Sequence, residues 1–417
     1  MPELTLAGLP ASLLDANFWL ARAGHPDAPL IPPAAIAAFN ARVYDRIGVP
    51  PVLALPDVLE AGAVMDIIVR IEPPDGPHYN GAGQPVGAAY FDALAANARP
   101  SLSSPVEARF GLAIRRTDVR TFPTADVLTS APFDFALDRF QETTIDVGWP
   151  AAALATSRDG RWVFCLTPHY WGWVQAEHIA FGSREDVARF VQAEPFGVVT
   201  ASRGLAAFAS GGGVTPQMGT RLPLREETGR AYRVAVPVRT ASGALGLVDG
   251  TIARDTGEFA AGYLPCTLRT LFTHAFKLLF EPYAWGGSRL GMFGRDCSRF
   301  VRDVIAVTGV ILPRNGAQQA AVGTPCATFP PGASESERKA LLVEQTPPGA
   351  ILVLPGHVML YLGHVDGEPY AIHATRSHGF AHVIVSDLTL GRGTPSGSLL
   401  ERLTQAVTLG APTHTKE

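Results

Sequence analysis

The chain has 417 residues, of which 34 are Lys or Arg and 38 are Asp or Glu, so its formal net charge is −4. This balance excludes a nucleic-acid binder that relies on a strongly basic surface. A hydrophobic content of 47% excludes a chain that is disordered for lack of apolar residues. The 42 glycines and 35 prolines follow no period, which favours many short strands joined by turns.

The sequence contains no apolar run of about 20 residues, the length that a membrane helix needs. Met1 to Thr5 also lack the basic start and apolar stretch of a secretory leader. We therefore expect no membrane span and a cytoplasmic location, or a periplasmic or secreted one if a leader has been removed. The four cysteines lie at least 29 residues apart, which fits neither a zinc site nor a disulfide scaffold: Cys165, Cys266, Cys297 and Cys326.

In the first three segments of the chain, no residues are spaced as in a catalytic motif. Residues 1–104 are rich in Ala and Pro, and we expect them to form a mostly helical or irregular clip. Residues 105–192 consist of short apolar runs and tight turns, with Asp159-Gly160 as a strong hairpin signal, and predict a small SH3-like β-barrel. Residues 193–258 repeat this texture and predict a second small barrel.

Residues 259–417 form the last predicted domain. Apolar residues recur at helical spacing from Leu268 to Phe280, a glycine-rich loop follows, and a second helix is expected to begin at about Asp296 or Cys297. The short apolar runs downstream predict strands, one of which ends near His373. Helices first and antiparallel strands afterwards are typical of an α+β domain.

The chemistry is expected at the start of that second helix. A cysteine at a helix N-terminus feels the positive end of the helix dipole, so we expect a lowered pKa for Cys297 and a helix cap from Asp296. A nucleophilic cysteine also needs a base that is held by a third group. Because adjacent antiparallel strands bring side chains to about 5 Å, His357 and His373 are candidates for the base and for the residue that orients it.

These motifs together resemble the NlpC-type, or NlpC/P60, papain-like cysteine peptidases of bacterial cell walls. The matching stretches are Tyr283-Ala284-Trp285-Gly286-Gly287, Asp296-Cys297-Ser298, Gly356-His357-Val358 and Ile372-His373-Ala374. Leu312-Pro313-Arg314-Asn315, with Gln318 or Gln319, matches a segment that follows the nucleophile helix. The resemblance implies Cys297 as nucleophile, His357 as base and His373 as the orienting residue, with the Cys297 backbone N–H in the oxyanion hole.

The segments upstream resemble one subgroup that carries a clip and two bacterial SH3-like domains before the peptidase. This resemblance implies a γ-D-glutamyl-L-diamino acid endopeptidase that acts on murein peptides with a free N-terminal L-Ala. It further implies that Tyr283, Asp296 and Ser298 line the substrate pocket and that Asp296 binds the free amine. Tyr170 of the first barrel is a candidate to face the same amine. No cofactor and no metal are implied.

Several alternatives stay open at this point. Asp296 could be a helix cap alone, and Tyr283 and Tyr170 could serve packing alone. The chain could be an autolysin that cuts intact peptidoglycan stems or, with a broken triad, a non-catalytic wall-binding protein. Arg299 stands where many wall peptidases have Gly, and the insertion of residues 326–345 is expected to be a surface loop or short helix. A metal site at His373, His378 and His382 is disfavoured, because Val383-Ile384-Val385 predicts a strand, on which His378 and His382 would lie far apart, and because no acidic partner lies nearby.

Overall fold

The computed structural model describes residues 9–69, 75–100, 102 and 104–410, so Met1 to Thr5, on which the expected absence of a leader depends, lie outside the described residues. The chain divides into two compact units. The α/β unit consists of Met1–Ile47, Leu264–Tyr283 and Arg295–Glu417, and the double-sheet unit consists of Gly48–Tyr263 and Ala284–Gly294. The segment expected to be one clip is therefore shared between the two units.

The first sheet of the double-sheet unit contains seven antiparallel strands in the order β11-β5-β8-β9-β10-β6-β7. The predicted hairpin at Asp159-Gly160 joins β8 to β9, and Gly160 takes a φ of 72°, which glycine adopts without a Cβ penalty. The strands are β5 Arg109–Ala113, β6 Thr117–Arg120, β7 Gln141–Ile145, β8 Pro150–Thr156, β9 Trp162–Leu166, β10 Trp171–Gln175 and β11 Ile179–Phe181.

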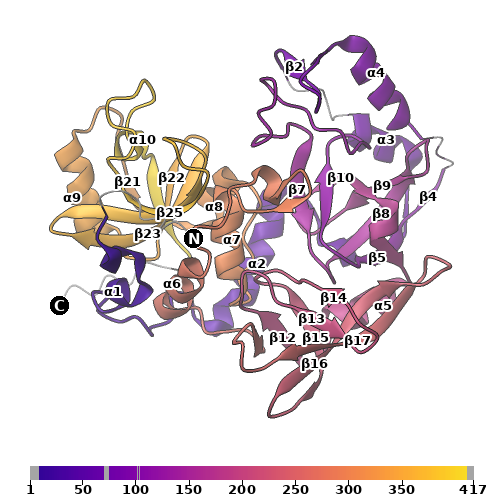
Figure 1. Ribbon diagram of the computed structural model, residues 1–417, viewed down its shortest axis with the longest axis horizontal. Helices are drawn as coiled ribbons and strands as arrows, with labels where there is room; N and C mark the ends of the chain where they lie inside the picture. The colour runs from indigo at the N-terminus through magenta and orange to yellow at the C-terminus, as the bar shows by residue number, and fades with distance from the viewer. Residues whose placement is uncertain (1–8, 70–74, 101, 103, 411–417) are drawn as a thin grey trace. The chain divides into compact units, whose positions relative to one another are not determined.

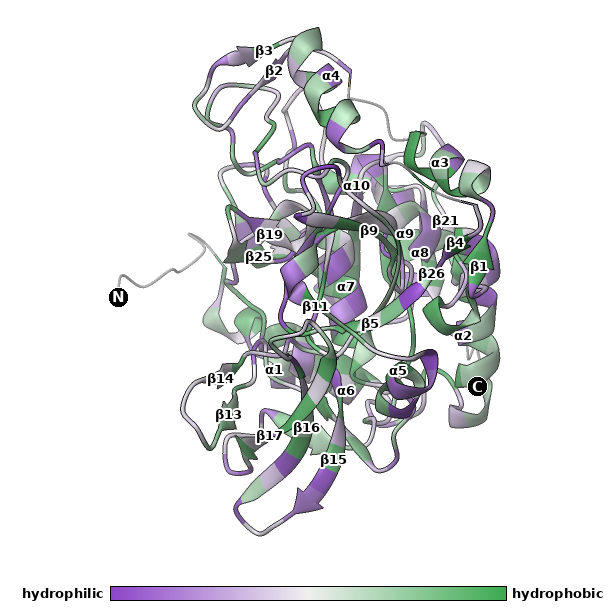
Figure 2. Ribbon diagram, turned by 90° about the vertical axis from the view of Figure 1, so that its right-hand side faces the viewer, coloured by the Kyte–Doolittle hydropathy of each residue, from purple (hydrophilic) through white to green (hydrophobic). Residues whose placement is uncertain are grey.

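The second sheet of this unit also has seven antiparallel strands, in the order β14-β13-β17-β16-β15-β12-β18. The far end of its β15–β16 hairpin is hydrophilic (Figure 2), where Glu226, Glu227 and Arg230 lie. The strands are β12 Phe196–Val199, β13 Ala206–Phe208, β14 Gly213–Val214, β15 Arg221–Glu227, β16 Ala231–Arg239, β17 Leu245–Ala253 and β18 Phe259–Ala261.

One helix links the two sheets and contributes to the core that they share. The helix α5, Arg184–Val191, begins with a capping box at Ser183, and its Val187 and Phe190 are buried in a cluster with residues of both sheets. The remaining elements of the double-sheet unit are η2 Val52–Ala54, β1 Val58–Leu59, α3 Ala61–Val69, β2 His78–Tyr79, β3 Pro85–Val86, α4 Ala88–Asn97, β4 Val106–Glu107, η3 Ala176–His178, η4 Trp285–Gly287, β19 Ser288–Arg289 and β20 Met292–Phe293.

The N-terminal segment of the α/β unit packs onto the C-terminal part of the same unit. Trp19 is 1% exposed, and its ring lies 5.5 Å from the ring of Tyr370. The Asn40 side chain donates to the Gly309 carbonyl and accepts from the Ile311 N–H, so helix α2 is tied to a loop some 270 residues away in sequence. The elements here are η1 Ala11–Leu14, α1 Ala16–Leu20, α2 Pro33–Ile47 and α6 Leu268–Phe276.

The sheet of the α/β unit has six antiparallel strands in the order β21-β26-β22-β23-β24-β25. Helices α7 and α9 lie on either side of it (Figure 1), and Leu342 of α9 is buried against the sheet. The expected insertion is strand β21 followed by α9. The elements are α7 Cys297–Ala306, α8 Gly316–Val322, β21 Thr324–Thr328, α9 Glu335–Gln345, β22 Ile351–Leu354, β23 His357–Val365, β24 Glu368–Thr375, β25 His382–Asp387, α10 Leu399–Arg402 and β26 Gln405–Thr408.

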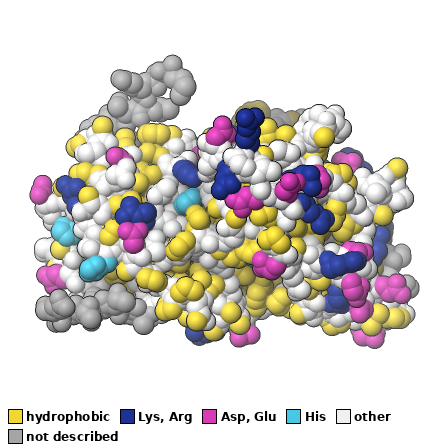
Figure 3. Space-filling model, turned by 90° about the horizontal axis from the view of Figure 1, so that it is seen from below, with side chains coloured by type: hydrophobic (Ala, Val, Ile, Leu, Met, Phe, Trp, Pro, Cys, Tyr) yellow, Lys and Arg dark blue, Asp and Glu magenta, His cyan; other side chains and the backbone are white. Residues whose placement is uncertain are grey.

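The surface and the helix lengths agree with the composition. Acidic and basic side chains lie next to one another on the face shown in Figure 3, which fits a net charge near zero. Over the ranges that the structure describes, no helix combines the length and apolar character that a membrane crossing needs.

Candidate active site

Cys297 is the first residue of helix α7, as the sequence predicts. Asp296 caps the helix, because its carboxylate accepts a hydrogen bond of 2.9 Å from the Arg299 N–H. The first N–H groups of a helix have no partner within the helix and carry a positive partial charge. The thiol therefore stands beside backbone donors that favour negative charge.

The expected lowering of the Cys297 pKa is nevertheless wrong. Burial raises the pKa of the thiol to about 11, and the negative charge of Asp296 acts in the same direction. The backbone N–H groups of Val358 and Ser298 and the charge of Arg314 lower it, but not enough to offset burial. Burial likewise raises the pKa of Cys266 and of Cys326 to about 11, so the neighbours of Cys297, and not its pKa, set it apart.

His357 and His373 are brought together across two strands. His357 begins β23 and His373 lies in β24, and the pairing of Leu360 with Ile372 makes the two histidines diagonal neighbours. The His357 Nε2 and the His373 Nδ1 are 2.8 Å apart, which is a hydrogen bond. The Val358 N–H that lowers the Cys297 pKa belongs to the residue after His357, so the thiol lies at the start of the same strand.

Both imidazoles are neutral at pH 7. Burial, reinforced by the charge of Arg402, lowers the pKa of His357 to about 4. Burial first, and then the neighbouring rings of His357 and His378, hold the pKa of His373 well below its usual value. Because the Nε2 of His357 is engaged with His373, Nδ1 is the nitrogen of His357 that can accept a proton from outside the pair.

A buried charged cluster surrounds the helix cap. Arg314 pairs with the Asp296 carboxylate and donates to the Ser298 hydroxyl at 2.7 Å, and the Ser298 hydroxyl lies 3.3 Å from Asp296. The amide nitrogen of Gln319 donates to the carbonyls of Ser298 and Pro313. Of the two glutamines that the motif left open, Gln319 is therefore the one that holds this turn.

Tyr283 lies near the start of α7 in the α/β unit. It forms a parallel bridge with Arg295, and its backbone N–H donates to the Ala381 carbonyl at 2.8 Å. Burial raises the pKa of its hydroxyl, and the charges of Asp296 and Cys297 add to this. Tyr283, Asp296, Cys297 and Ser298, four of the expected site residues, are thus neighbours at one helix start.

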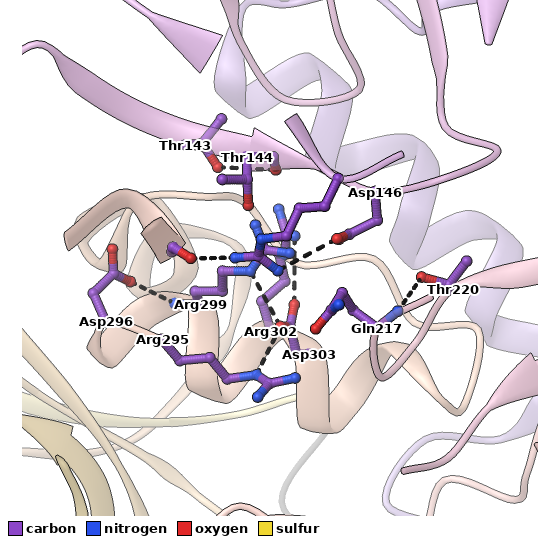
Figure 4. Close-up of polar contacts among 12 residues, drawn as sticks. Thr143, Thr144, Asp146, Gln217, Thr220, Arg295, Asp296, Arg299, Arg302 and Asp303 are labelled. Carbon is purple, nitrogen blue, oxygen red and sulfur yellow. Dashed lines mark hydrogen bonds and ion pairs between the residues drawn. The ribbon is translucent and has the colours of Figure 1, made fainter. Parts of the chain in front are cut away.

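Arg299 is buried and pairs with Asp303 of the same helix. Figure 4 shows Arg295, which lies just before α7, and Arg299 and Arg302 of α7 converging on Asp303. The Asp303 carboxylate accepts from the Arg295 Nε at 2.9 Å and from the Arg299 Nε at 3.2 Å, and these side chains are buried. The Arg299 side chain, at a position where many wall peptidases have Gly, is therefore accommodated by a buried ion pair with Asp303.

The aromatic-glycine loop that precedes the nucleophile belongs to the double-sheet unit. Arg116, which lies between β5 and β6, donates to the Gly287 carbonyl and stacks over the Phe293 ring at 4.4 Å, and Arg203 lies over the same ring at 5.2 Å. Tyr170 also lies in this unit, half-buried in the turn before β10, where its carbonyl accepts from Thr167. The proposed contact of Tyr170 with substrate stays a prediction.

Arg314, Gln319 and Ser386 are the polar partners to which sequence reasoning assigned no role. The motif around Arg314 and Gln319 marked the segment, but nothing in it indicated an ion pair with Asp296. Ser386 has a weak signal only, a polar residue at the end of the apolar run Val383-Ile384-Val385.

Two family models match the chain. The model described as "NlpC/P60 family" matches residues 280–389, and the one described as "SH3 domain (SH3b1 type)" matches residues 129–175. No curated protein is similar enough to the chain to match it in a sequence comparison.

Solved structures show the same fold. An NlpC/P60 endopeptidase from Photobacterium damselae subsp. piscicida aligns with 95% of this chain and 96% of its own, at 18% identity and a TM-score of 0.74. An NlpC/P60 family protein from Bacillus cereus ATCC 10987 aligns with 72% of this chain and 99% of its own, at 19% identity and a TM-score of 0.52. The chain therefore carries an NlpC/P60 domain, the domain of peptidoglycan cysteine peptidases. In the sequence this domain follows an SH3 domain of the SH3b1 type.

Proposed function

We propose that this chain is a cysteine endopeptidase that hydrolyses the bond between γ-D-Glu and the diamino acid of murein peptides. The observation that carries the proposal is the joining of Cys297 at a helix start with the hydrogen-bonded pair His357 and His373, inside a domain of the NlpC/P60 family. A thiol beside a neutral imidazole that a second imidazole orients is the arrangement that nucleophilic catalysis requires.

The proposed reaction starts from the neutral thiol and neutral imidazole. The His357 Nδ1 takes the thiol proton as the Cys297 sulfur attacks the γ-carbonyl carbon of D-Glu, and backbone N–H groups at the start of α7 bind the resulting oxyanion. His357 then gives its proton to the leaving amine of the diamino acid, which leaves a thioester on Cys297. A water molecule, deprotonated by His357, hydrolyses the thioester and restores the thiol.

The proposed substrate carries a free N-terminal L-Ala. Support comes from the resemblance of the whole chain to clip-and-barrel endopeptidases and from the clustering of Tyr283, Asp296 and Ser298 beside the nucleophile. A cationic amine next to the Asp296 carboxylate would gain a charge-assisted hydrogen bond. Arg314 already pairs with one oxygen of that carboxylate, so the amine contact rests on the other oxygen, which also accepts from the Arg299 N–H.

The direct test is incubation with the tripeptide L-Ala-γ-D-Glu-diamino acid, with L-Ala-γ-D-Glu detected by mass spectrometry. We expect turnover by the wild-type protein and none by Cys297→Ala. Cys326→Ala is the matched control, because Cys326 lies in β21, where its thiol contacts the Ala406 carbonyl of β26, and its loss should leave activity unchanged. An inactive wild type, or an active Cys297→Ala, would overturn the proposal.

The alternative substrate is the intact peptidoglycan stem, whose L-Ala is acylated. N-acetylation of the tripeptide should lower turnover strongly if the free amine is bound. Equal turnover of the free and acetylated peptides, together with release of soluble fragments from purified cell walls, would support an autolysin instead.

A further inference from the structure

Ser386 forms a hydrogen bond with His373, and the proposed function assigns no role to Ser386. Ser386 lies in β25, and its Oγ is 3.1 Å from the Nε2 of His373. His373 pairs directly with Ile384, so Ser386 is two residues along on the same face, within diagonal reach of the ring. A continuous row thus runs from His357 through His373 to Ser386.

His373 has no exposed surface, and both of its ring nitrogens are engaged. Its Nδ1 meets the His357 Nε2, and its Nε2 meets the Ser386 hydroxyl. A neutral imidazole carries one N–H and one lone pair, so the proton on one nitrogen dictates the role of the other. The whole row can therefore take only two proton arrangements while both histidines stay neutral.

In the first arrangement, the His357 Nε2–H donates to His373, and the His373 Nε2–H donates to Ser386. The His357 Nδ1 is then a lone pair that can accept the thiol proton of Cys297. In the second arrangement, His373 donates from Nδ1 to His357, and His357 must carry its proton on Nδ1. That arrangement has no base, because the nitrogen left for the nucleophile is already protonated.

We propose that Ser386 is a positioning residue that holds His373, and through it His357, in the productive proton arrangement; this rests on the proposed function. The physical reason is an asymmetry between buried donors and acceptors. A buried N–H without a partner is rarer and costlier than a buried lone pair without one. If Ser386 is lost, the productive arrangement leaves the His373 N–H orphaned, whereas the unproductive one leaves only a lone pair.

Removal of the hydroxyl should therefore move the pair toward the unproductive arrangement. Ser386→Ala should lower kcat about tenfold at similar KM. An unpaired buried donor disfavours the productive arrangement by a factor of about ten or more. Ser386→Thr keeps the hydroxyl and should restore most of the activity. Ser377→Ala is the matched control, because Ser377 bonds to Thr375 and is exposed.

The deciding measurement is the tautomer of each ring, read from imidazole ¹⁵N shifts at pH 7 and assigned with His357→Gln and His373→Gln. Wild type, Ser386→Thr and Ser377→Ala should show Nε2–H in both histidines, and Ser386→Ala should show Nδ1–H at His357. The rate of Cys297 alkylation, localised by mass spectrometry, should fall in Ser386→Ala alone. Neither readout needs a peptide substrate, so both stand if the proposed substrate is wrong.

Unchanged tautomers and an unchanged alkylation rate in Ser386→Ala would overturn the inference, as would Nδ1–H at His357 in the wild type. If the alanine variant does not fold, Ser386→Cys replaces it, because a thiol is a weak acceptor and should produce the same change in part.

Discussion

At the scale of single residues, burial sets the protonation of the nucleophile and its base. His357 must be neutral to accept a proton, and its pKa in the folded protein is about 4, below the ordinary value for histidine. The base is therefore present above pH 4 and lost as the pH falls through that value. We expect kcat/KM for the tripeptide to hold between pH 5 and 7 and to drop near pH 4.

The measurement is kcat/KM from pH 3.5 to 8, with circular dichroism at each pH to separate titration from unfolding. Loss of half the activity near pH 6.5, with the fold intact, would mean that His357 titrates as an exposed histidine and would contradict the buried environment described above.

The Asp296–Arg314 pair gives a second prediction at this scale. Both side chains are buried, so Arg314→Met leaves the Asp296 carboxylate without its cation and should cost about 3–5 kcal/mol of unfolding free energy. Because Arg314 also lowers the Cys297 pKa, alkylation of the thiol at fixed pH should slow. Urea unfolding and the alkylation rate measure the two effects.

The control for this prediction is the exposed pair of Arg392 and Glu335. Arg392→Met should change the unfolding free energy by less than about 1 kcal/mol, since exposed ion pairs are weak. Equal losses in the two variants would show that the Asp296–Arg314 pair is not buried as described.

The sequence predicted residues whose role depends on local position, and it failed where the role depends on distant partners. Cys297 at a helix start and the Asp296 cap follow from neighbours in the chain, and the helix is found there. The Cys297 pKa was predicted in the wrong direction, because the burial that raises it comes from packing far along the chain. Ser386 joins the histidines through the register of β24 and β25, which no local pattern specifies.

At the scale of elements, the loop Ala284–Gly294 gives a prediction with a matched pair of glycines. Gly286 and Gly291 both have positive φ, 63° and 74°, so alanine costs about 1–2 kcal/mol of backbone strain at either position. A Cβ at Gly286 would also lie 2.4 Å from the Gln141 Cγ, whereas one at Gly291 would meet nothing within 4 Å.

Gln141 cannot move aside cheaply, because it is buried and bonded to Arg120 and to Asp118. Gly286→Ala should therefore lose about 1–3 kcal/mol more than Gly291→Ala through overpacking. Urea unfolding of the two variants measures the difference, and limited proteolysis should cut the loop faster in Gly286→Ala. Matching stabilities would mean that the loop does not pack on β7.

Elements with turn or cap signals were predictable, and those defined by pairing were not. Asp159-Gly160 gave the β8–β9 hairpin, because a tight turn is a local property. The insertion was expected as a loop or short helix, and the helix begins with a capping box at Ser334. Strand β21 was missed, since it is held by pairing with β26, about 80 residues later in the chain.

At the scale of the whole molecule, the division into two units was not predictable. The sequence suggested one clip over residues 1–104, yet the structure assigns Met1–Ile47 to the α/β unit and the part from Gly48 onward to the double-sheet unit. Gly48 and Pro50-Pro51 indicate that a helix ends near Ile47, but they do not indicate what each side packs against, and the division depends on that packing. Trp19 against Tyr370 and Asn40 against Gly309 are contacts that only the folded chain brings about.

This division predicts that a destabilising substitution in the N-terminal segment lowers the stability of the α/β unit. Trp19 is almost fully buried, and its indole N–H donates to the Leu13 carbonyl at 3.0 Å. Trp19→Ala should cost about 3–5 kcal/mol, the usual range for a large aromatic side chain removed from a core. Phe133→Ala, which removes an aromatic ring that is 62% exposed, is the control and should change little.

The location of the loss is measured by hydrogen exchange. Trp19→Ala should reduce protection in β22 to β25 and leave β8, β9 and β16 as protected as in the wild type, because those strands belong to the core of the other unit. Thermal inactivation of the peptidase should shift to lower temperature in the same variant. Equal loss of protection in both sets of strands would show that the two units unfold as one, and the division would then describe contacts without describing cooperativity.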